Sequence, residues 1–122
     1  MFFRGTIVRG GGIARTLGYP TANLDVPPKK ISMRDGVYAA RVTHEGAVYD
    51  AALIIQEHVQ KVEVYLFAYD GPDFYGAELE VMPVQKVSEI EAMDGDELKA
   101  KIAQDIAAIK EVLLHGDEGS DC

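Results

Sequence analysis

The sequence lacks the features that identify several large classes of protein. Its only cysteine is the last residue, Cys122, so no disulfide can form within the chain and no zinc-type Cys/His cluster is present. No apolar run reaches the roughly 18 residues that a membrane span needs. Residues 1–4 turn polar too soon for a signal peptide. These absences predict a cytoplasmic protein without a membrane segment.

Basic residues are also scarce. The chain has 12 lysines and arginines against 20 aspartates and glutamates, which gives a formal net charge of −8. This balance argues against binding to the phosphate backbone of a nucleic acid, although a few local donors suffice to hold a small anion. At 122 residues the chain is too short for two well-filled cores. We therefore expect a monomer with a single domain, over residues 1–116.

Short β-rich runs occupy the first two thirds of the chain, at residues 3–9, 36–43, 47–55, 59–69 and 77–87. Gly, Pro or Asp clusters separate most of them, which is typical of an antiparallel barrel or sandwich. The period then changes to that of a helix, with apolar side chains at Leu98, Ile102, Ile106, Ile109 and Leu113. We expect one amphipathic C-terminal helix that starts at residues 94–97 and ends at Gly116. A disordered acidic tail, residues 117–122, would follow it.

Three consecutive glycines stand in the segment RGGGIARTLG, residues 9–18. Glycine lets backbone N–H groups approach an anion closely, and Arg9 and Arg15 add charged donors. The segment matches neither the Walker A spacing nor the dinucleotide fingerprint. By itself, it is more simply interpreted as a flexible connection between strands.

The segment GYPTANLDVPP, residues 18–28, combines three prolines with a closely spaced pair of polar side chains. Thr21 and Asn23 would point the same way if the segment is extended, and Pro20 favours extended geometry in the residue before it. A hydroxyl and an amide carbonyl are hard oxygen ligands that suit a magnesium ion bridging phosphates. The alternative is that both side chains only cap local backbone groups.

A third segment, KVEVYLFAYDGPDFYG at residues 61–76, contains a carboxylate between bulky neighbours. Period two places Val62, Val64 and Leu66 on one face of a strand and Glu63 on the other. A partly desolvated carboxylate has a raised pKa and can serve as a general base. The alternative is a solvated glutamate paired with Lys61.

In this order, the glycine loop, the PTAN block, GVYA, the V-E-V-x-L strand, D-F-Y-G and the acidic helix resemble the riboflavin kinase (flavokinase) family, over about residues 3–112. PTAN is the most specific of these motifs. The resemblance implies a mainly β fold, a six-stranded antiparallel Greek-key barrel with one C-terminal helix. It also implies an enzyme that transfers the γ-phosphate of ATP to the 5′-hydroxyl of riboflavin, with magnesium, and produces FMN and ADP.

The resemblance also implies roles for individual residues. Glu63 matches the base that takes the hydroxyl proton, and Thr21 and Asn23 match the pair that binds magnesium and phosphate. A further set falls where the family contacts the nucleotide: Gly10, Arg15, Leu66, Ala68 and Tyr75. Because Met1 runs directly into the first strand, we expect a stand-alone kinase module.

The flavin side departs from the family pattern. The family usually carries Leu-Arg and then a phenylalanine after the barrel, whereas residues 86–89 and 92–93 here read KVSE and AM. No arginine follows Arg41, which leaves Lys86 as a candidate for the missing charge. Two alternatives therefore stay open. One is a non-catalytic barrel that binds flavin or nucleotide, and the other is a kinase of this fold with another small hydroxylated acceptor.

Overall fold

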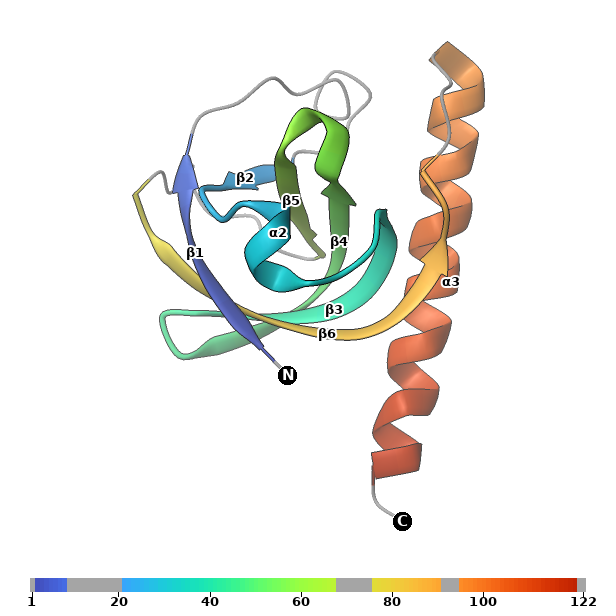
Figure 1. Ribbon diagram of the computed structural model, residues 1–122. Helices are drawn as coiled ribbons and strands as arrows, with labels where there is room; N and C mark the ends of the chain where they lie inside the picture. The colour runs from blue at the N-terminus through green and yellow to red at the C-terminus, as the bar shows by residue number, and fades with distance from the viewer. Residues whose placement is uncertain (1, 9–20, 68–75, 91–94, 121–122) are drawn as a thin grey trace.

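A computed structural model of the chain describes residues 2–8, 21–67, 76–90 and 95–120. In these segments six antiparallel strands close into a barrel, and one long helix lies along its side (Figure 1). The strands are β1 (Phe3–Val8), β2 (Ala22–Leu24), β3 (Gly36–His44), β4 (Ala47–Gln56), β5 (Lys61–Leu66) and β6 (Glu78–Ser88). The helices are the short α2 (Pro28–Ile31), the 3-10 turn η1 (Glu57–Val59) and the long α3 (Gly95–Ser120). The expected fold class is confirmed.

The strand order around the barrel is β1-β2-β5-β4-β3-β6. Strands β3, β4 and β5 follow one another along the chain and pair as neighbours, while β2 lies beside β5 and not beside β3. This arrangement is a Greek key. Its consequence for the site is that β2, which carries the PTAN block, pairs with β5, which carries Glu63, across about 40 residues of chain.

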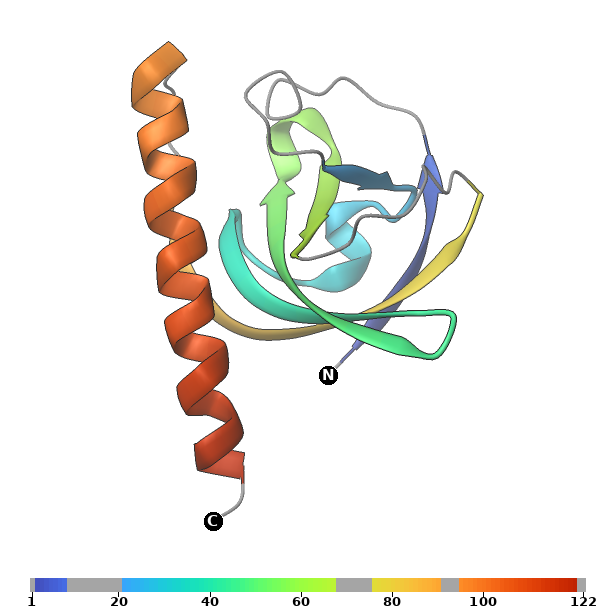
Figure 2. The ribbon, with the colours of Figure 1, turned by 180° about the vertical axis from the view of Figure 1, so that it is seen from behind.

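The barrel has an inner and an outer hydrophobic cluster because the strand side chains alternate. The inner cluster fills the barrel and includes Leu53, Val64 and Leu79. The outer cluster lies where α3 packs on β3 and β4, and there Ile109 and Leu113 of the helix are fully buried. Figure 2 shows α3 along this one side of the barrel. The second half of the predicted apolar stripe therefore anchors the helix.

Helix α3 is longer than expected. It continues past Gly116 to Ser120, so the helix end predicted at Gly116 is wrong, and residues 117–120 of the expected tail are helical. Glycine weakens a helix interior by about 1 kcal/mol and does not by itself end one. The Arg41 guanidinium holds α3 to the barrel by donating to the Leu113 carbonyl at 3.0 Å. No helix in the described segments is both long and apolar enough to cross a membrane.

Two other boundaries differ from the sequence-based expectation. The strand expected over residues 59–69 begins only at Lys61, because η1 precedes it and Gln60 takes left-handed backbone geometry with φ 53°. Strand β2 and helix α2 were not predicted as separate elements. Each has only three or four residues, too few for a hydrophobic period to appear.

Candidate functional site

Strand pairing brings the polar residues of the PTAN block to Glu63. Asn23 of β2 lies directly opposite Glu63 of β5 in the antiparallel register. Ala22 and Leu24 alternate with Thr21 and Asn23 along the chain and pack with the inner cluster, so Thr21 and Asn23 belong to the outer face. Val62 and Val64 likewise point inward, which puts Glu63 on that same outer face. The expected grouping of the two polar side chains is present, and it includes the carboxylate.

Thr21 and Glu63 are in direct contact. The Thr21 hydroxyl donates to the Glu63 carboxylate over an Oγ1–Oε1 distance of 3.4 Å. This is long for an O–H···O hydrogen bond, so both oxygens keep lone pairs for another partner. The contact crosses between strands and supports the interpretation that Thr21 belongs to a site.

The environment of Glu63 perturbs its ionisation. The side chain is half-buried, with Ile54 opposite it on β4 and Tyr65 next on the outer face of β5. Burial raises the pKa of Glu63 above its ordinary value of 4.5, while the Lys61 charge and the Thr21 hydrogen bond act in the opposite direction. Burial is the largest of these effects. A carboxylate with a raised pKa is a better proton acceptor.

The raised pKa of Glu63 makes stability depend on pH in a defined direction. Below the unfolded pKa near 4.5 the carboxyl is protonated in both the folded and the unfolded state, so folding buries no charge at this position and stability is at its highest. As pH rises through the folded pKa, the buried group ionises and that stability is lost. Glu63→Gln is therefore expected to melt at a higher temperature than the native chain at pH 7, with the difference vanishing below about pH 4.5. Thermal melts of both proteins from pH 4 to pH 8 test this, and a less stable Gln variant at pH 7 contradicts it.

The donor set fits a hydrated magnesium ion. Thr21 and Asn23 present a hydroxyl and an amide oxygen on the face that carries Glu63, and hard oxygen ligands are what magnesium prefers. Across the described segments no group of three His, Cys, Asp or Glu side chains converges to hold a metal. An ion here would therefore take most of its ligands from water and phosphate, which is how magnesium accompanies nucleotides.

Of the remaining predicted site residues, the structure describes only Leu66. Leu66 is the last residue of β5 and is buried in the inner cluster, so it supports the strand from inside the barrel. Gly10, Arg15, Ala68 and Tyr75 lie outside the described residues.

Lys86, the candidate for the missing flavin-side charge, is already paired. Its Nζ lies 2.6 Å from the Glu89 carboxylate, and its alkyl chain lies so close to Gly36 that a Cβ there would meet the Lys86 Cε at 2.5 Å. Because the Glu89 side chain is 73% exposed, this ion pair is weak and does not fix Lys86 in place. A lysine lacks the planar fork of a guanidinium, so Lys86 would not reproduce the bidentate contacts of an arginine.

Sequence reasoning missed a charged pair on the barrel side of α3. Lys101 and Asp105 are one helical turn apart, and Asp105 precedes the buried Ile109 by another turn. The sequence-based expectation for this helix named only its apolar side chains. The available signal was their four-residue spacing in line with Ile109 and Leu113, which places them toward the barrel.

Comparison with known proteins decides the family. Residues 1–113 match the riboflavin kinase family, Flavokinase. The chain belongs to this family. It is 34% identical over 100 residues to a bifunctional riboflavin kinase/FMN adenylyltransferase of Mycoplasma pneumoniae, which covers 75% of this chain and 37% of that protein. It is 31% identical over 113 residues to an RNA-binding riboflavin kinase, RibR, of Bacillus subtilis, with 86% and 48% covered.

This chain shares its fold with the solved structure of riboflavin kinase from Trypanosoma brucei. The TM-score is 0.70 at 22% identity, over 93% of this chain and 79% of that one. The curated relatives are longer, and this chain spans 37% and 48% of the two named above. The likeness therefore covers the kinase part of these proteins and leaves their other activities aside.

Proposed function

We propose that this chain is a riboflavin kinase, which transfers the γ-phosphate of ATP to the 5′-hydroxyl of riboflavin to give FMN and ADP. The observation that carries this proposal is the pairing of Asn23 with Glu63, with Thr21 in contact with the same carboxylate. A general base therefore stands beside two oxygen ligands for a phosphate-bound metal. Phosphoryl transfer needs little beyond this, because positioning and charge neutralisation supply most of its catalysis.

The geometry supports the following roles. Glu63 accepts the proton of the riboflavin 5′-hydroxyl as that oxygen forms its bond to the γ-phosphorus, and the bond to ADP breaks with its electron pair. Thr21 and Asn23 would hold magnesium, and with it the phosphates, on the same outer face as the base. Magnesium, when bound, neutralises charge on the phosphate oxygens. Because Asn23 and Glu63 are paired on neighbouring strands, the residue proposed for the phosphates lies one strand spacing from the residue proposed for the riboflavin hydroxyl.

Two other functions predict different behaviour. A non-catalytic barrel would bind flavin or nucleotide without forming FMN, and a kinase with another acceptor would bind ATP without binding riboflavin. The raised pKa of Glu63 favours a catalyst, because a base needs that property and a passive binder does not. We further propose that the protein acts as a cytoplasmic monomer that does not bind nucleic acid.

The flavin-side departures predict a weakened acceptor site. We expect detectable riboflavin binding that is roughly 5- to 150-fold weaker than that of a relative with the arginine, because each lost polar contact costs about 1–3 kcal/mol. The defect should appear mainly in the KM for riboflavin, because the base and the metal ligands are intact. Titration of riboflavin with protein, followed by quenching of flavin fluorescence, measures this directly.

Each extreme of that titration is informative. Sub-micromolar affinity would show that other contacts replace the arginine. No quenching at millimolar protein, with magnesium and a non-hydrolysable ATP analogue present, would overturn riboflavin as the acceptor. A reference titration with a relative that carries the Leu-Arg segment fixes the scale.

A further inference from the structure

Lys61 begins strand β5 on the same outer face as the proposed base. Along β5, buried residues alternate with half-buried ones, and Lys61 and Glu63 are both half-buried. They point away from the buried Val62 between them, onto the outer face of the barrel. Two residues of a strand rise about 6.6 Å, so the backbone sets the two side chains next to each other. The positive charge of Lys61 is felt at the carboxylate, because it lowers the pKa of Glu63.

Within the described segments, Lys61 is the half-buried lysine that has no carboxylate partner. The other half-buried lysines are both in ion pairs. Lys86 lies 2.6 Å from Glu89, and Lys101 lies 2.6 Å from Asp105. Removing an ammonium from water without a counter-charge costs free energy, and a bound anion offsets that cost. The surroundings of Lys61 therefore favour an anionic ligand.

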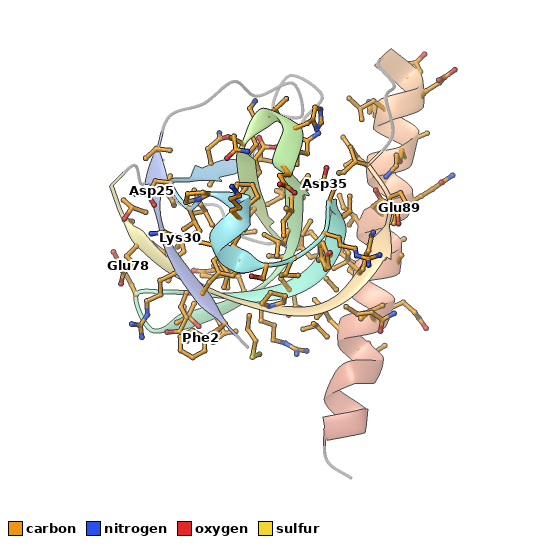
Figure 3. The ribbon with its side chains drawn as sticks, in the orientation of Figure 1. Phe2, Asp25, Lys30, Asp35, Glu78 and Glu89 are labelled. Carbon is orange, nitrogen blue, oxygen red and sulfur yellow. The ribbon has the colours of Figure 1, made fainter. Side chains whose placement is uncertain are left out.

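The residues that flank Lys61 on the two neighbouring strands do not neutralise its charge. On β4, the residue directly opposite Lys61 is the neutral Gln56. On the β2 side, Asp25 follows the last residue of the strand, but its carboxylate accepts the Thr6 N–H at 2.8 Å. Figure 3 shows Asp25 beside β1. The three N–H donors of Lys61 thus remain available to a ligand on the outer face.

The ligand that the proposed function brings to this face is strongly anionic. The triphosphate of ATP carries more negative charge than one magnesium ion neutralises, and kinases commonly add a lysine or arginine. Of the residues in β2 and β5, only Lys61 is basic. The γ-phosphorus must approach the hydroxyl whose proton Glu63 accepts, so the γ-phosphate has to lie close to this base. Lys61 is the neighbouring cation along the strand.

We propose that Lys61 is a further catalytic residue, whose ammonium donates hydrogen bonds to the γ-phosphate of ATP and stabilises the charge on its oxygens during transfer. The inference rests on the proposed function and adds a residue to its site. Lys61 keeps its proton throughout, since the hydroxyl proton passes to Glu63 and the electron pair of the broken bond leaves with ADP. A donor held in place before the reaction stabilises that charge without reorganisation.

The test is Lys61→Met, which removes the ammonium and keeps a long unbranched side chain. We expect kcat to fall about 10-fold or more, with riboflavin affinity unchanged. Nucleotide binding gives the specific readout. In the presence of magnesium, the variant should lose about 10-fold or more in affinity for a non-hydrolysable ATP analogue and keep its affinity for ADP, which lacks the γ-phosphate. Calorimetric titrations measure both affinities, and retained ADP binding also shows that the variant is folded.

Two further variants at this position control for structural effects. Lys61→Gln keeps a polar side chain without the charge and should reproduce the losses of Lys61→Met. Lys61→Arg keeps the charge and should recover part of kcat and of the affinity for the ATP analogue. The matched control elsewhere is Lys99→Met, which removes an exposed lysine of α3 and should behave as the native chain.

The outcomes separate this inference from the proposed function. If the native chain forms FMN while Lys61→Met and Lys61→Gln keep native kcat and native affinity for the ATP analogue, the role of Lys61 is overturned and the kinase function stands. An equal loss of affinity for ADP and for the analogue in both variants would also overturn a contact specific to the γ-phosphate. If the native chain does not form FMN, the proposed function and this inference fail together.

Discussion

Glu63→Gln is expected to lower the kcat of FMN formation by roughly 10²–10⁴-fold, the usual contribution of a general base. The glutamine amide keeps the shape of the side chain and cannot accept the hydroxyl proton. Thr21 can still donate to the remaining carbonyl oxygen, so the local structure should persist. Steady-state kinetics with saturating riboflavin and ATP, in the presence of magnesium, measure the loss.

Glu57→Gln is the matched control for this variant. Glu57 is an exposed glutamate in η1, near the start of β5, and its substitution by glutamine removes the same charge outside the site. It should retain native kcat. ATP affinity should also be nearly unchanged in Glu63→Gln, because the proposed metal ligands Thr21 and Asn23 remain. Full activity of the Glu63→Gln variant would remove the base from the mechanism.

Substitution of the proposed metal ligands, Thr21 and Asn23, is expected to have the second large effect. Thr21→Val or Asn23→Ala should weaken magnesium-dependent ATP binding by about 10-fold or more, since each removes one hard oxygen ligand. Riboflavin affinity should change much less, because the proposed role of Thr21 and Asn23 is to hold the metal and the phosphates. Calorimetric titration of ATP with and without magnesium, beside a fluorescence titration of riboflavin, separates the two affinities.

Thr43→Val is the matched control for Thr21→Val. Thr43 is a half-buried threonine on β3, three strands around the barrel from β2, and its substitution by valine removes the same hydroxyl group. It should leave magnesium-dependent ATP binding unchanged. If neither Thr21→Val nor Asn23→Ala alters ATP affinity in the presence of magnesium, the two residues are not metal ligands.

Much of the site was predictable because side-chain alternation can be read from sequence. The V-E-V pattern correctly placed Glu63 on the face opposite Val62 and Val64, and the spacing of Thr21 and Asn23 correctly placed them together. The alternation of side chains predicts which face of a strand a residue occupies, but it does not predict which strand pairs with which. The pairing of Asn23 with Glu63 joins residues 40 positions apart, and it depends on the Greek-key order of the whole barrel.

The parts that were missed have physical reasons. Strand β2 is three residues long and owes its existence to pairing with β1 and β5, which a local pattern does not express. Lys101 and Asp105 look solvated by residue type, and only their four-residue spacing from Ile109 indicates that they face the barrel. Glycine often follows the end of a helix, which is why Gly116 predicts one, yet α3 continues through it.

The central claim is that this chain phosphorylates riboflavin at the base beside Asn23 and Thr21. Its most direct test is a single-turnover reaction, with protein in excess over riboflavin and with ATP and magnesium saturating, in which FMN and ADP are separated and quantified over time. We predict that one FMN and one ADP form per riboflavin, and that the chemical step slows in Glu63→Gln to the same degree as kcat. Riboflavin left unconverted by the native chain, or an equal rate in the Glu63→Gln variant, would contradict the account.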